Sequence, residues 1–321
     1  MTSPPKSQNM PRFDITIAGE LNLDLILYGL PGELPREREL LADRMMLTLG
    51  SSSAIVAHNL ACLGSRVGFQ SRIGNDELGE IALKRLSESG VDTTLVGRAP
   101  ASNTGLTVIL QHDHWRNILT YSGAISEITI RDLKFDYLSD SRHFHLSSFY
   151  LQSGLRPDVP ELFRRLKAAG LTTSLDTNDD PENRWADDLH EVLRYVDVFL
   201  PNQREVCRIA RTDDLELAVD QLSQVVPLVI VKLGPNGAMA RRGNEKVHCP
   251  AVKVDAVDPV GAGDSFDAGF LHQYVLGADL ADCLAWGNLA GALSTTRPGG
   301  TEAFRDREHL ERFFREHVAT L

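Results

Sequence analysis

Residues 258–270 of the chain read DPVGAGDSFDAGF, a glycine turn that leads directly into an apolar helical pattern. The side chains of Gly261, Ala262 and Gly263 are so small that the backbone can approach a ligand closely, and successive N–H groups at a helix start bind anions. Asp264 follows at once. In phosphoryl transfer to an alcohol, such N–H groups would stabilise the transferred phosphoryl while the carboxylate takes the hydroxyl proton. The alternative interpretation is an ordinary turn with an acid that stabilises the helix N-terminus.

The order of apolar segments on both sides of this turn predicts an α/β protein. Short β-rich runs alternate with helix-length segments, which is typical of a central, mostly parallel sheet with helices on both faces. The predicted strands are 13–19, 67–74, 142–148, 171–177, 196–201 and 227–234. The predicted helices are 52–64, 77–90, 159–170, 202–211, 263–276, 279–296 and 306–317. Residues 1–12 are expected to be a disordered N-terminal tail, and 13–321 a single domain.

Two stretches interrupt the alternation of strands and helices. Parts of 21–48 and 95–122 carry alternating apolar patterns without intervening helices, and they predict a small sheet of antiparallel strands. Such a projection is either a lid over a site or a sheet-edge extension used for packing or dimerisation, and the pattern favours neither. A homodimer formed through this lid is a further expectation.

Composition and missing motifs exclude several classes of function. The formal net charge of −11 argues against sequence-independent binding of DNA or RNA, which needs a basic face. No apolar run is long enough to span a bilayer. The scattered cysteines fit a reduced, cytoplasmic protein. No G-x-G-x-x-G follows the first strand and no G-x-x-x-x-G-K-[ST] occurs, so a nicotinamide-dependent dehydrogenase is the least favoured alternative and a P-loop kinase is disfavoured.

Residues 258–270 resemble the C-terminal signature of the ribokinase-like (PfkB) carbohydrate kinases. Five other stretches resemble segments of that family in the same order, namely AGELNLDL (18–25), RIGNDELG (72–79), PNQREV (201–206), VIVKLGPNGA (229–238) and NLAGALSTTRPGG (288–300). The resemblance covers nearly the whole chain. It implies a three-layer α/β sandwich with a small β lid, and ATP-dependent phosphorylation of a hydroxymethyl group on a sugar or sugar-like substrate.

The resemblance also implies residue roles. Asp264 would be the base, and the backbone of Gly261, Ala262 and Gly263 the anion hole. Substrate contacts would come from Asn22, Asp24, Gly50, Ser51 and Ser53. Contacts with ATP would come from Asn202, Lys232, Gly234, Asn236, Gly237 and Asn288. Glu205 would hold Mg²⁺ through water. A monovalent cation such as K⁺ would lie among Asp258, Val260, Ser294, Arg297 and Gly299.

Several of these residues have a plain structural interpretation as well. Glu205 could be an acid in the first turn of a helix. Asn288 could be a hydrogen-bonded polar group within a helix. Lys232 could be a charge at a strand end that extends to water.

The chain departs from the family pattern at two places. Where the family usually reads Gly-Gly-x-x-x-Asn-x-Ala, Ser51 replaces the second Gly and Ile55 replaces the Asn, so one sugar hydrogen bond is missing. Ser51 and Ser53 either bind the sugar or cap the helix that follows. Ser147 and Ser148 stand about where ribokinase has a Glu, and four residues follow downstream that either cap a helix or line the acceptor pocket: Asp176, Asn178, Asp179 and Asp180.

These departures argue against a ribokinase and leave the substrate open. A nucleoside kinase of the same fold and a non-catalytic, ligand-sensing kinase homologue remain alternatives.

Overall fold

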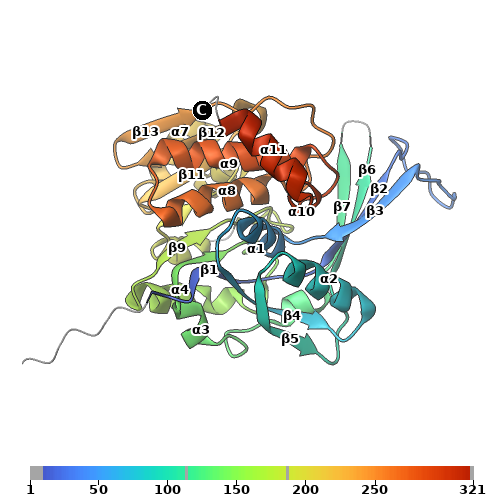
Figure 1. Ribbon diagram of the computed structural model, residues 1–321, viewed down its shortest axis with the longest axis horizontal. Coiled ribbons are helices and arrows are strands. Elements are labelled where there is room, and N and C mark those ends of the chain that lie inside the picture. The colour runs from blue at the N-terminus through green and yellow to red at the C-terminus, as the bar shows by residue number, and fades with distance from the viewer. Residues whose placement is uncertain (1–9, 113–114, 186–187, 319–321) are drawn as a thin grey trace, which may run out of the picture.

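The computed structural model describes residues 10–112, 115–185 and 188–318, and its main feature is a nine-stranded sheet (Figure 1). The strands lie in the order β13-β12-β11-β10-β9-β8-β1-β4-β5. Their bounds are β1 Phe13–Ala18, β4 Val67–Gly74, β5 Asp92–Ala99, β8 Ser141–Leu146, β9 Thr172–Leu175, β10 Val198–Phe199, β11 Leu228–Lys232, β12 Ala238–Arg242 and β13 Glu245–Cys249. Most of the predicted N-terminal tail, residues 1–9, lies outside the described residues.

Seven of these strands run parallel, and β12 and β13 extend one edge of the sheet in antiparallel order. The prediction of a mostly parallel sheet is confirmed. The predicted strand 196–201 is shorter than expected, because only Val198–Phe199 pairs on both sides. The sequence analysis did not predict β12 and β13, although Gly243 supplies the positive φ (57°) that a tight hairpin needs.

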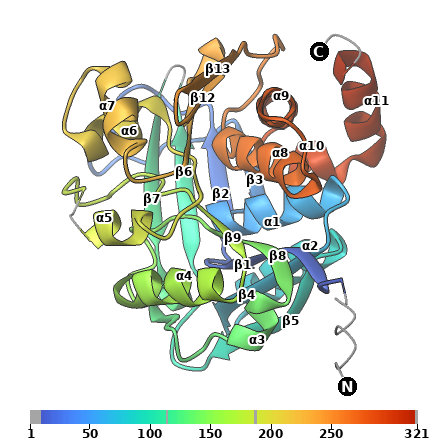
Figure 2. The ribbon, with the colours of Figure 1, turned by 90° about the vertical axis from the view of Figure 1, so that its left-hand side faces the viewer.

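Helices cover both faces of the sheet, because successive strand residues point to opposite sides (Figure 2). One face packs against α1 Ser52–Cys62, α2 Glu77–Glu88, α8 Ala262–Leu276 and α9 Leu280–Thr295. The other packs against α3 Phe135–Ser139, α4 Val159–Ala168, α5 Asp188–Leu193, α6 Gln203–Ala210 and α7 Leu215–Leu222. Outside α9 lie α10 Glu302–Arg305 and α11 Arg307–Val318. Within residues 10–112, 115–185 and 188–318, no helix is both long and apolar enough to cross a membrane.

The predicted small sheet is present and projects from the main body (Figure 1). Its strands lie in the order β3-β2-β6-β7, with bounds β2 Leu23–Tyr28, β3 Arg44–Leu49, β6 Leu106–Gln111 and β7 Arg116–Tyr121. Two details differ from the prediction. Residues 95–99 belong to β5 of the main sheet, because they pair with β4, and β2 pairs with β6 in parallel.

The small sheet rests on the glycine turn that precedes α8. Ile26 and Ile109, on one face of this sheet, pack against Val260. The Tyr28 hydroxyl donates a hydrogen bond of 2.7 Å to Asp258 Oδ2. The first fifth of the chain therefore contacts the segment that the sequence analysis placed at the centre of the site.

Candidate active site

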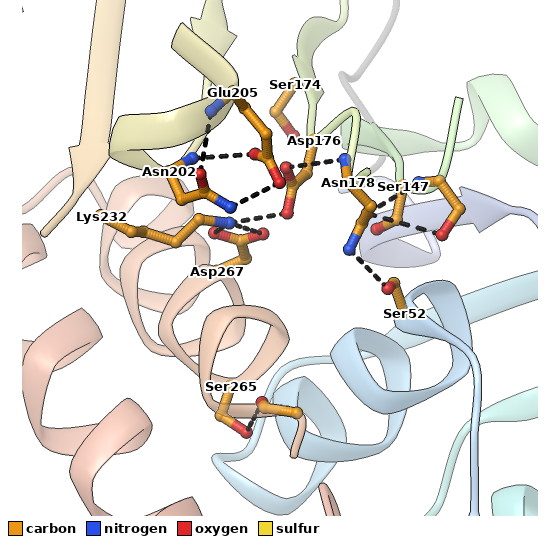
Figure 3. Close-up of polar contacts among 12 residues, drawn as sticks. Ser52, Ser147, Ser174, Asp176, Asn178, Asn202, Glu205, Lys232, Ser265 and Asp267 are labelled. Carbon is orange, nitrogen blue, oxygen red and sulfur yellow. Dashed lines mark hydrogen bonds and ion pairs between the residues drawn. The ribbon is translucent and has the colours of Figure 1, made fainter. Parts of the chain in front are cut away.

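Asn202, Glu205 and Lys232 of the predicted site residues lie where the parallel strands end, facing the starts of two helices (Figure 3). Asp176 follows β9, Asn202 follows β10, and Lys232 ends β11. The helices α1 and α8 begin opposite these strand ends, beside Ser52 and Asp264. The carboxyl edge of a parallel sheet is where ligands bind in open α/β folds.

The glycine turn is held in place by side chains that the sequence analysis did not single out. Gly261 has φ +74°, and a Cβ on it would collide with Gly300. Ser265 Oγ donates to the Gly261 carbonyl at 2.7 Å, and Asn59 Nδ2 donates to Ser265 Oγ at 2.9 Å and to the Gly300 carbonyl at 3.0 Å. These contacts join residues far apart in the chain, so no local pattern indicates them.

One N–H group of the predicted anion hole is engaged within the turn. The Ala262 N–H donates to the Pro259 carbonyl at 3.2 Å. Gly261 and Gly263 flank it, and Gly263 is exposed. The turn therefore presents an accessible backbone at the start of α8, where unpaired N–H groups and the helix dipole favour an anion.

Asp264 is buried in the first turn of α8, with 8% of its surface exposed. Burial and the nearby charge of Asp176 raise its pKa to about 6, against the opposing effect of the Lys232 ammonium. A carboxylate with a pKa near 6 is a stronger base than an exposed aspartate and is still mostly ionised at neutral pH. Its properties suit the removal of a proton from an alcohol.

Lys232 is bound between two buried carboxylates. Its Nζ lies 2.6 Å from Asp176 Oδ2 and 3.1 Å from Asp267 Oδ2. Burial alone would lower the pKa of Lys232, but the two carboxylates raise it, so the ammonium stays charged. Burial raises the pKa of Asp267, whereas the Lys232 charge holds the pKa of Asp176 down despite burial. Lys232 therefore forms ion pairs with both carboxylates, and its pair with Asp176 is the shorter of the two.

This geometry contradicts the interpretation of Lys232 as a strand-end charge that extends to water. The side chain does not extend to water from the strand end, because its Nζ is tied down within the site. It lies 3.7 Å from the position that a Cβ on Gly263 would occupy. A fixed positive charge thus stands beside the glycine turn.

Asn202 and Glu205 form a capping box at the start of α6. The Glu205 N–H donates to Asn202 Oδ1 at 3.0 Å, and the Asn202 N–H donates to Glu205 Oε2 at 2.9 Å. The interpretation of Glu205 as an acid in the first turn of a helix is therefore confirmed. The same carboxyl also lies near Asp176, and burial and the charge of Asp176 raise the pKa of Glu205 to about 8.

Asp24 and Asn22 lie at the base of the small sheet. Burial and the charge of Asp264 raise the pKa of Asp24 to about 7, so the two carboxyl groups are close enough to influence each other. Asn22 Nδ2 donates to Thr107 Oγ1 at 3.2 Å, and its Oδ1 is buried without a partner among the described residues. Any Cβ on Gly50 would collide with the Asp24 carboxylate. The predicted acceptor contacts are therefore brought together, and Gly50 leaves room for Asp24.

The serines after Gly50 bind Glu20, a residue that the sequence analysis did not select. Ser51 Oγ donates to the Glu20 carbonyl at 2.9 Å, and Ser53 Oγ donates to Glu20 Oε2 at 2.7 Å. Ser51 precedes α1 with φ +61° and makes no side-chain capping bond, so the interpretation of Ser51 and Ser53 as helix caps is wrong. The hydroxyl of Ser53 is fully buried against Glu20.

Ile55 packs beneath the turn. Its Cδ1 lies 2.7 Å from the position of a Cβ on Gly300 and 3.4 Å from that on Gly261. The apolar replacement therefore supports the glycine turn from below.

The four polar residues after β9 have separate roles. Asp176 pairs with Lys232, and Asn178 Nδ2 donates to Ser52 Oγ at 2.8 Å. Asp180 accepts the N–H groups of residues 182, 184 and 185, so it closes the loop 181–185 and does not cap a helix. Asp179 is exposed beside Arg204.

The residues expected at the nucleotide surround the end of β11. Gly234 and Gly237 have φ +58° and +87°, and Asn236 lies between them in a short 3₁₀ turn, Gly234–Asn236. Asn288 Nδ2 donates to the carbonyls of Cys249 and Pro250, both at 3.0 Å. Its amide group therefore joins α9 to the end of β13 by hydrogen bonds. This agrees with the interpretation of Asn288 as a hydrogen-bonded polar group within a helix.

The residues expected around a monovalent cation also lie close together. Asp258 Oδ1 accepts the Val260 N–H at 2.9 Å, and Asp258 Oδ2 accepts the Gly299 N–H at 3.1 Å. Ser294 Oγ is buried without a partner among the described residues. Arg297 pairs with Asp306.

Known proteins resemble this chain over most of its length. The 2-dehydro-3-deoxygluconokinase of Bacillus subtilis is 30% identical over 83% of this chain and 86% of its own. The ATP-dependent ribose-1-phosphate kinase of Halopiger xanaduensis is 31% identical over 89% of this chain and 93% of its own. A candidate ribokinase II from E. coli, solved with ATP and Mg²⁺, superposes with a TM-score of 0.81 at 28% identity over 95% of this chain and all of its own.

The family match agrees with the geometry of the site. The model of the pfkB family carbohydrate kinases matches residues 13–307, which include every strand of both sheets. A buried carboxylate after a glycine turn, with a fixed lysine beside it, is an arrangement that can move a phosphoryl group to an alcohol. The chain belongs to the pfkB family of carbohydrate kinases.

Proposed function

We propose that the protein transfers the γ-phosphoryl of ATP to a hydroxymethyl group of a sugar or sugar-like substrate, with Asp264 as the base. The observation that carries this proposal is the position of Asp264, buried at the start of α8 directly after the turn 261–263. The acceptor would lie between Asp24, Asn22 and Asp264. The unpaired Asn22 Oδ1 is available to accept one of its hydroxyl protons.

In the proposed reaction, the chain supplies a base, an anion site and a positive charge. Asp264 takes the proton of the attacking hydroxyl, while the backbone of Gly261 and Gly263 and the Lys232 ammonium stabilise the charge on the transferred phosphoryl. Asp176 and Asp267 keep Lys232 in place. The Asp264 base and the nearby Lys232 ammonium are both held in position before the substrates bind.

Mg²⁺ suits the oxygen-rich side chains near Asn202, and ATP would lie along the turns after β10 and β11. Glu205 and Asp176 supply buried carboxyl oxygens there. Mg²⁺ usually keeps several waters, so one or two carboxyl groups are enough to hold it beside phosphate. Mg²⁺ neutralises phosphate charge when it is bound. The E. coli structure with ATP and Mg²⁺ supports the same pair of ligands for this chain.

Replacing the proposed base tests the function. In Asp264→Asn the carboxylate is lost and the shape is kept, so we expect kcat to fall about 10²- to 10⁴-fold. ATP binding, measured by calorimetry, should change little, because Asp264 is assigned to the acceptor side. The acceptor comes from a panel of pentoses, hexoses, sugar acids and nucleosides. Near wild-type transfer by the variant would refute the assignment of the base.

The same panel separates the remaining alternatives. A nucleoside kinase from Methanothermobacter thermautotrophicus is 28% identical over 88% of this chain, so nucleosides belong in the panel. A ligand-sensing protein without catalysis would bind ATP and transfer phosphate to no acceptor.

A potassium site at Asp258 is a further part of the proposal. The unpaired Ser294 hydroxyl supports it, because a cation would use this buried oxygen. Asp258 already accepts three hydrogen bonds, so an ion there would share the carboxylate with Tyr28. Transfer rates in K⁺ and in tetramethylammonium should then differ, and equal rates would contradict the site.

The small sheet is proposed to act as a lid and as a dimer interface. Closure of a lid excludes water, which would otherwise consume ATP. Strand β7 is an edge strand whose residues are all exposed, and apolar Ile118 and Leu119 are both more than half exposed. A second copy covering this edge would bury them. Light scattering of the wild type and Leu119→Lys should show a dimer and a monomer, respectively.

A further inference from the structure

Glu20, which follows β1, is joined to the start of α1 by three hydrogen bonds. Ser53 donates twice to the Glu20 carboxylate, from its N–H to Oε1 at 3.2 Å and from its hydroxyl to Oε2 at 2.7 Å. The Ser51 hydroxyl donates to the Glu20 carbonyl at 2.9 Å and shares its proton with the Gly50 carbonyl at 2.7 Å. The three bonds to Glu20, the Glu20 clasp, hold this turn through both the side chain and the backbone of Glu20.

The clasp lies beside the residues assigned to the acceptor. Asn22 and Asp24 follow Glu20 on the same segment of chain. The Gly50 N–H donates to the Asn22 carbonyl at 3.0 Å, and a Cβ on Gly50 would collide with Asp24. Gly50 therefore contacts both acceptor residues, and Ser51 directly after it is held by Glu20. The position of Asn22 and Asp24 relative to α1 depends on the clasp.

The carboxyl group of the clasp is enclosed by protein. Only 2% of the surface of Glu20 is exposed, and Ser53 is fully buried. A Cβ on Gly19 would collide with the Ser53 hydroxyl, so a larger residue directly before Glu20 would push the two partners apart. A buried polar group that loses its partner is costly, so the carboxyl and the Ser53 donors constrain each other.

Ser51 adopts a backbone conformation that is unfavourable for a serine. Its φ is +61° and its ψ is 135°. Glycine adopts such angles without strain, whereas other residues persist there only when the surrounding structure holds them. The serine supplies a hydroxyl that glycine lacks, and this hydroxyl reaches the Glu20 carbonyl. The bond to Glu20 is thus formed in spite of the strain.

We propose that Glu20 is a positioning residue for the acceptor. It holds the segment 20–24 against the start of α1, so that Asn22 and Asp24 meet the acceptor hydroxyls at fixed positions. Its own carboxyl is engaged by Ser53. The inference rests on the proposed function, which places the acceptor between Asp24, Asn22 and Asp264.

Amide hydrogen exchange of the full-length protein measures the clasp without any substrate. Glu20→Met keeps the length of the side chain and removes the carboxyl. The Gly50 amide should then exchange at least about tenfold faster than in the wild type, because its bond to the Asn22 carbonyl opens once the clasp is lost. Glu20→Gln should restore slow exchange, since its amide group can accept the Ser53 N–H and donate to the Ser53 hydroxyl. Exchange of the Gly50 amide at the wild-type rate in Glu20→Met would overturn the proposal.

Steady-state kinetics tests the connection with the acceptor. With the best acceptor of the panel, Glu20→Met should raise the acceptor KM about tenfold and leave the KM for ATP unchanged, and Glu20→Gln should restore the acceptor KM. Asp279→Ala is the matched control, because the Asp279 carboxylate caps α9 by accepting the Asp282 N–H at 2.9 Å, beyond the end of α8 that lies away from the site. It should lower the melting temperature and change neither KM. Equal increases of both KM values in Glu20→Met would indicate a general loss of structure and would count against a positioning role.

Ser51→Gly separates positioning from stability and serves where Glu20→Met does not fold. Glycine relieves the backbone strain but removes the hydroxyl bond to Glu20. The melting temperature should stay the same or rise, while the acceptor KM rises about fivefold. A wild-type acceptor KM in Ser51→Gly would show that the clasp does not position the acceptor. If no acceptor is phosphorylated, the proposed function fails, and hydrogen exchange still decides whether Glu20 holds the segment 20–24.

Discussion

Asp264 combines burial with a position at the start of a helix, and these two features act on its pKa in opposite directions. The helix start favours a negative charge, whereas burial and the carboxylate of Asp176 oppose it. Burial prevails, and the pKa rises to about 6. A base must be ionised to accept a proton, so we expect kcat/KM to rise with pH through about 6 and then level off. A pH profile checks this, and a rate that is flat between pH 5 and 8 would contradict it.

Glu205 is part of a capping box and is also proposed to hold Mg²⁺ through water, and a single substitution can distinguish these two roles. Gln can take the place of Glu in a capping box, but it has no carboxyl group that could ionise when Mg²⁺ binds. Glu205→Gln should therefore keep the melting temperature of the wild type while raising the Mg²⁺ concentration needed for half-maximal rate about tenfold. Glu205→Ala should lower both stability and Mg²⁺ response. If Glu205→Gln responds to Mg²⁺ as the wild type does, the carboxyl is only a helix cap.

At the scale of elements, α8 begins and ends at glycines with similar backbone angles but different surroundings. Gly261 has φ +74° and is packed against Gly300, whereas Gly277 has φ +81° and open space around it. Gly277→Ala should cost about 1–2 kcal/mol of stability and leave the transfer rate unchanged. Gly261→Ala should cost more and also remove activity, because the turn must move. Denaturation and kinetics of the two variants test whether the packing of this turn, beyond its angle, matters.

The elements themselves could largely be predicted from the sequence. The strand that ends at Lys232 and the helix that begins beside Asp264 both follow from local apolar patterns, and the structure has them within a few residues of the predicted bounds. The hairpin of β12 and β13 was missed, although Gly243 at its turn is a recognisable signal. The second stretch predicted for the small sheet began too early, at residue 95 instead of 106, because an alternating pattern does not show which sheet a strand joins.

The contacts between elements could not be predicted. Asn59 and Ser265, for example, meet only because α1 and α8 pack side by side. Serine and asparagine are common at helix starts and within helices, so their types carry no information about a partner 200 residues away. The motif residues were found because they recur as local patterns. The residues that position them have no such pattern.

At the scale of the whole molecule, two buried histidines of β8 form hydrogen bonds that run along the sheet toward the carboxyl ends of its strands. His143 and His145 bond to Ser174 Oγ from either side, both at 2.7 Å. His145 Nε2 also lies 2.7 Å from Ser147 Oγ. Burial lowers the pKa of both histidines to about 3, so they are neutral in the folded protein.

These histidines should make the protein sensitive to acid. Below pH 6.5 both histidines become protonated in the unfolded chain but stay neutral in the folded protein, so protonation favours unfolding. The contribution of the neutral histidines to the free energy of unfolding is therefore complete above pH 6.5 and is lost as the pH falls towards 3. His145→Gln removes one such group. Its stability deficit at pH 8 should shrink by about 2 kcal/mol at pH 5 relative to the wild type. Urea denaturation at both pH values provides the measurement, and a constant difference would contradict it.

The position of β1 in the middle of the nine-stranded sheet has a consequence for synthesis of the protein. The ribosome makes β1 before its two neighbours, β4 and β8, which are complete only at residues 74 and 146. Until then the nascent chain carries an apolar strand with open edges, which is prone to aggregate or to pair with other chains. Asp264 and the turn around Gly300 are made after every strand of both sheets. The growing polypeptide therefore needs protection while β1 has open edges, and it acquires no capacity to consume ATP before Asp264 and the turn around Gly300 have been made.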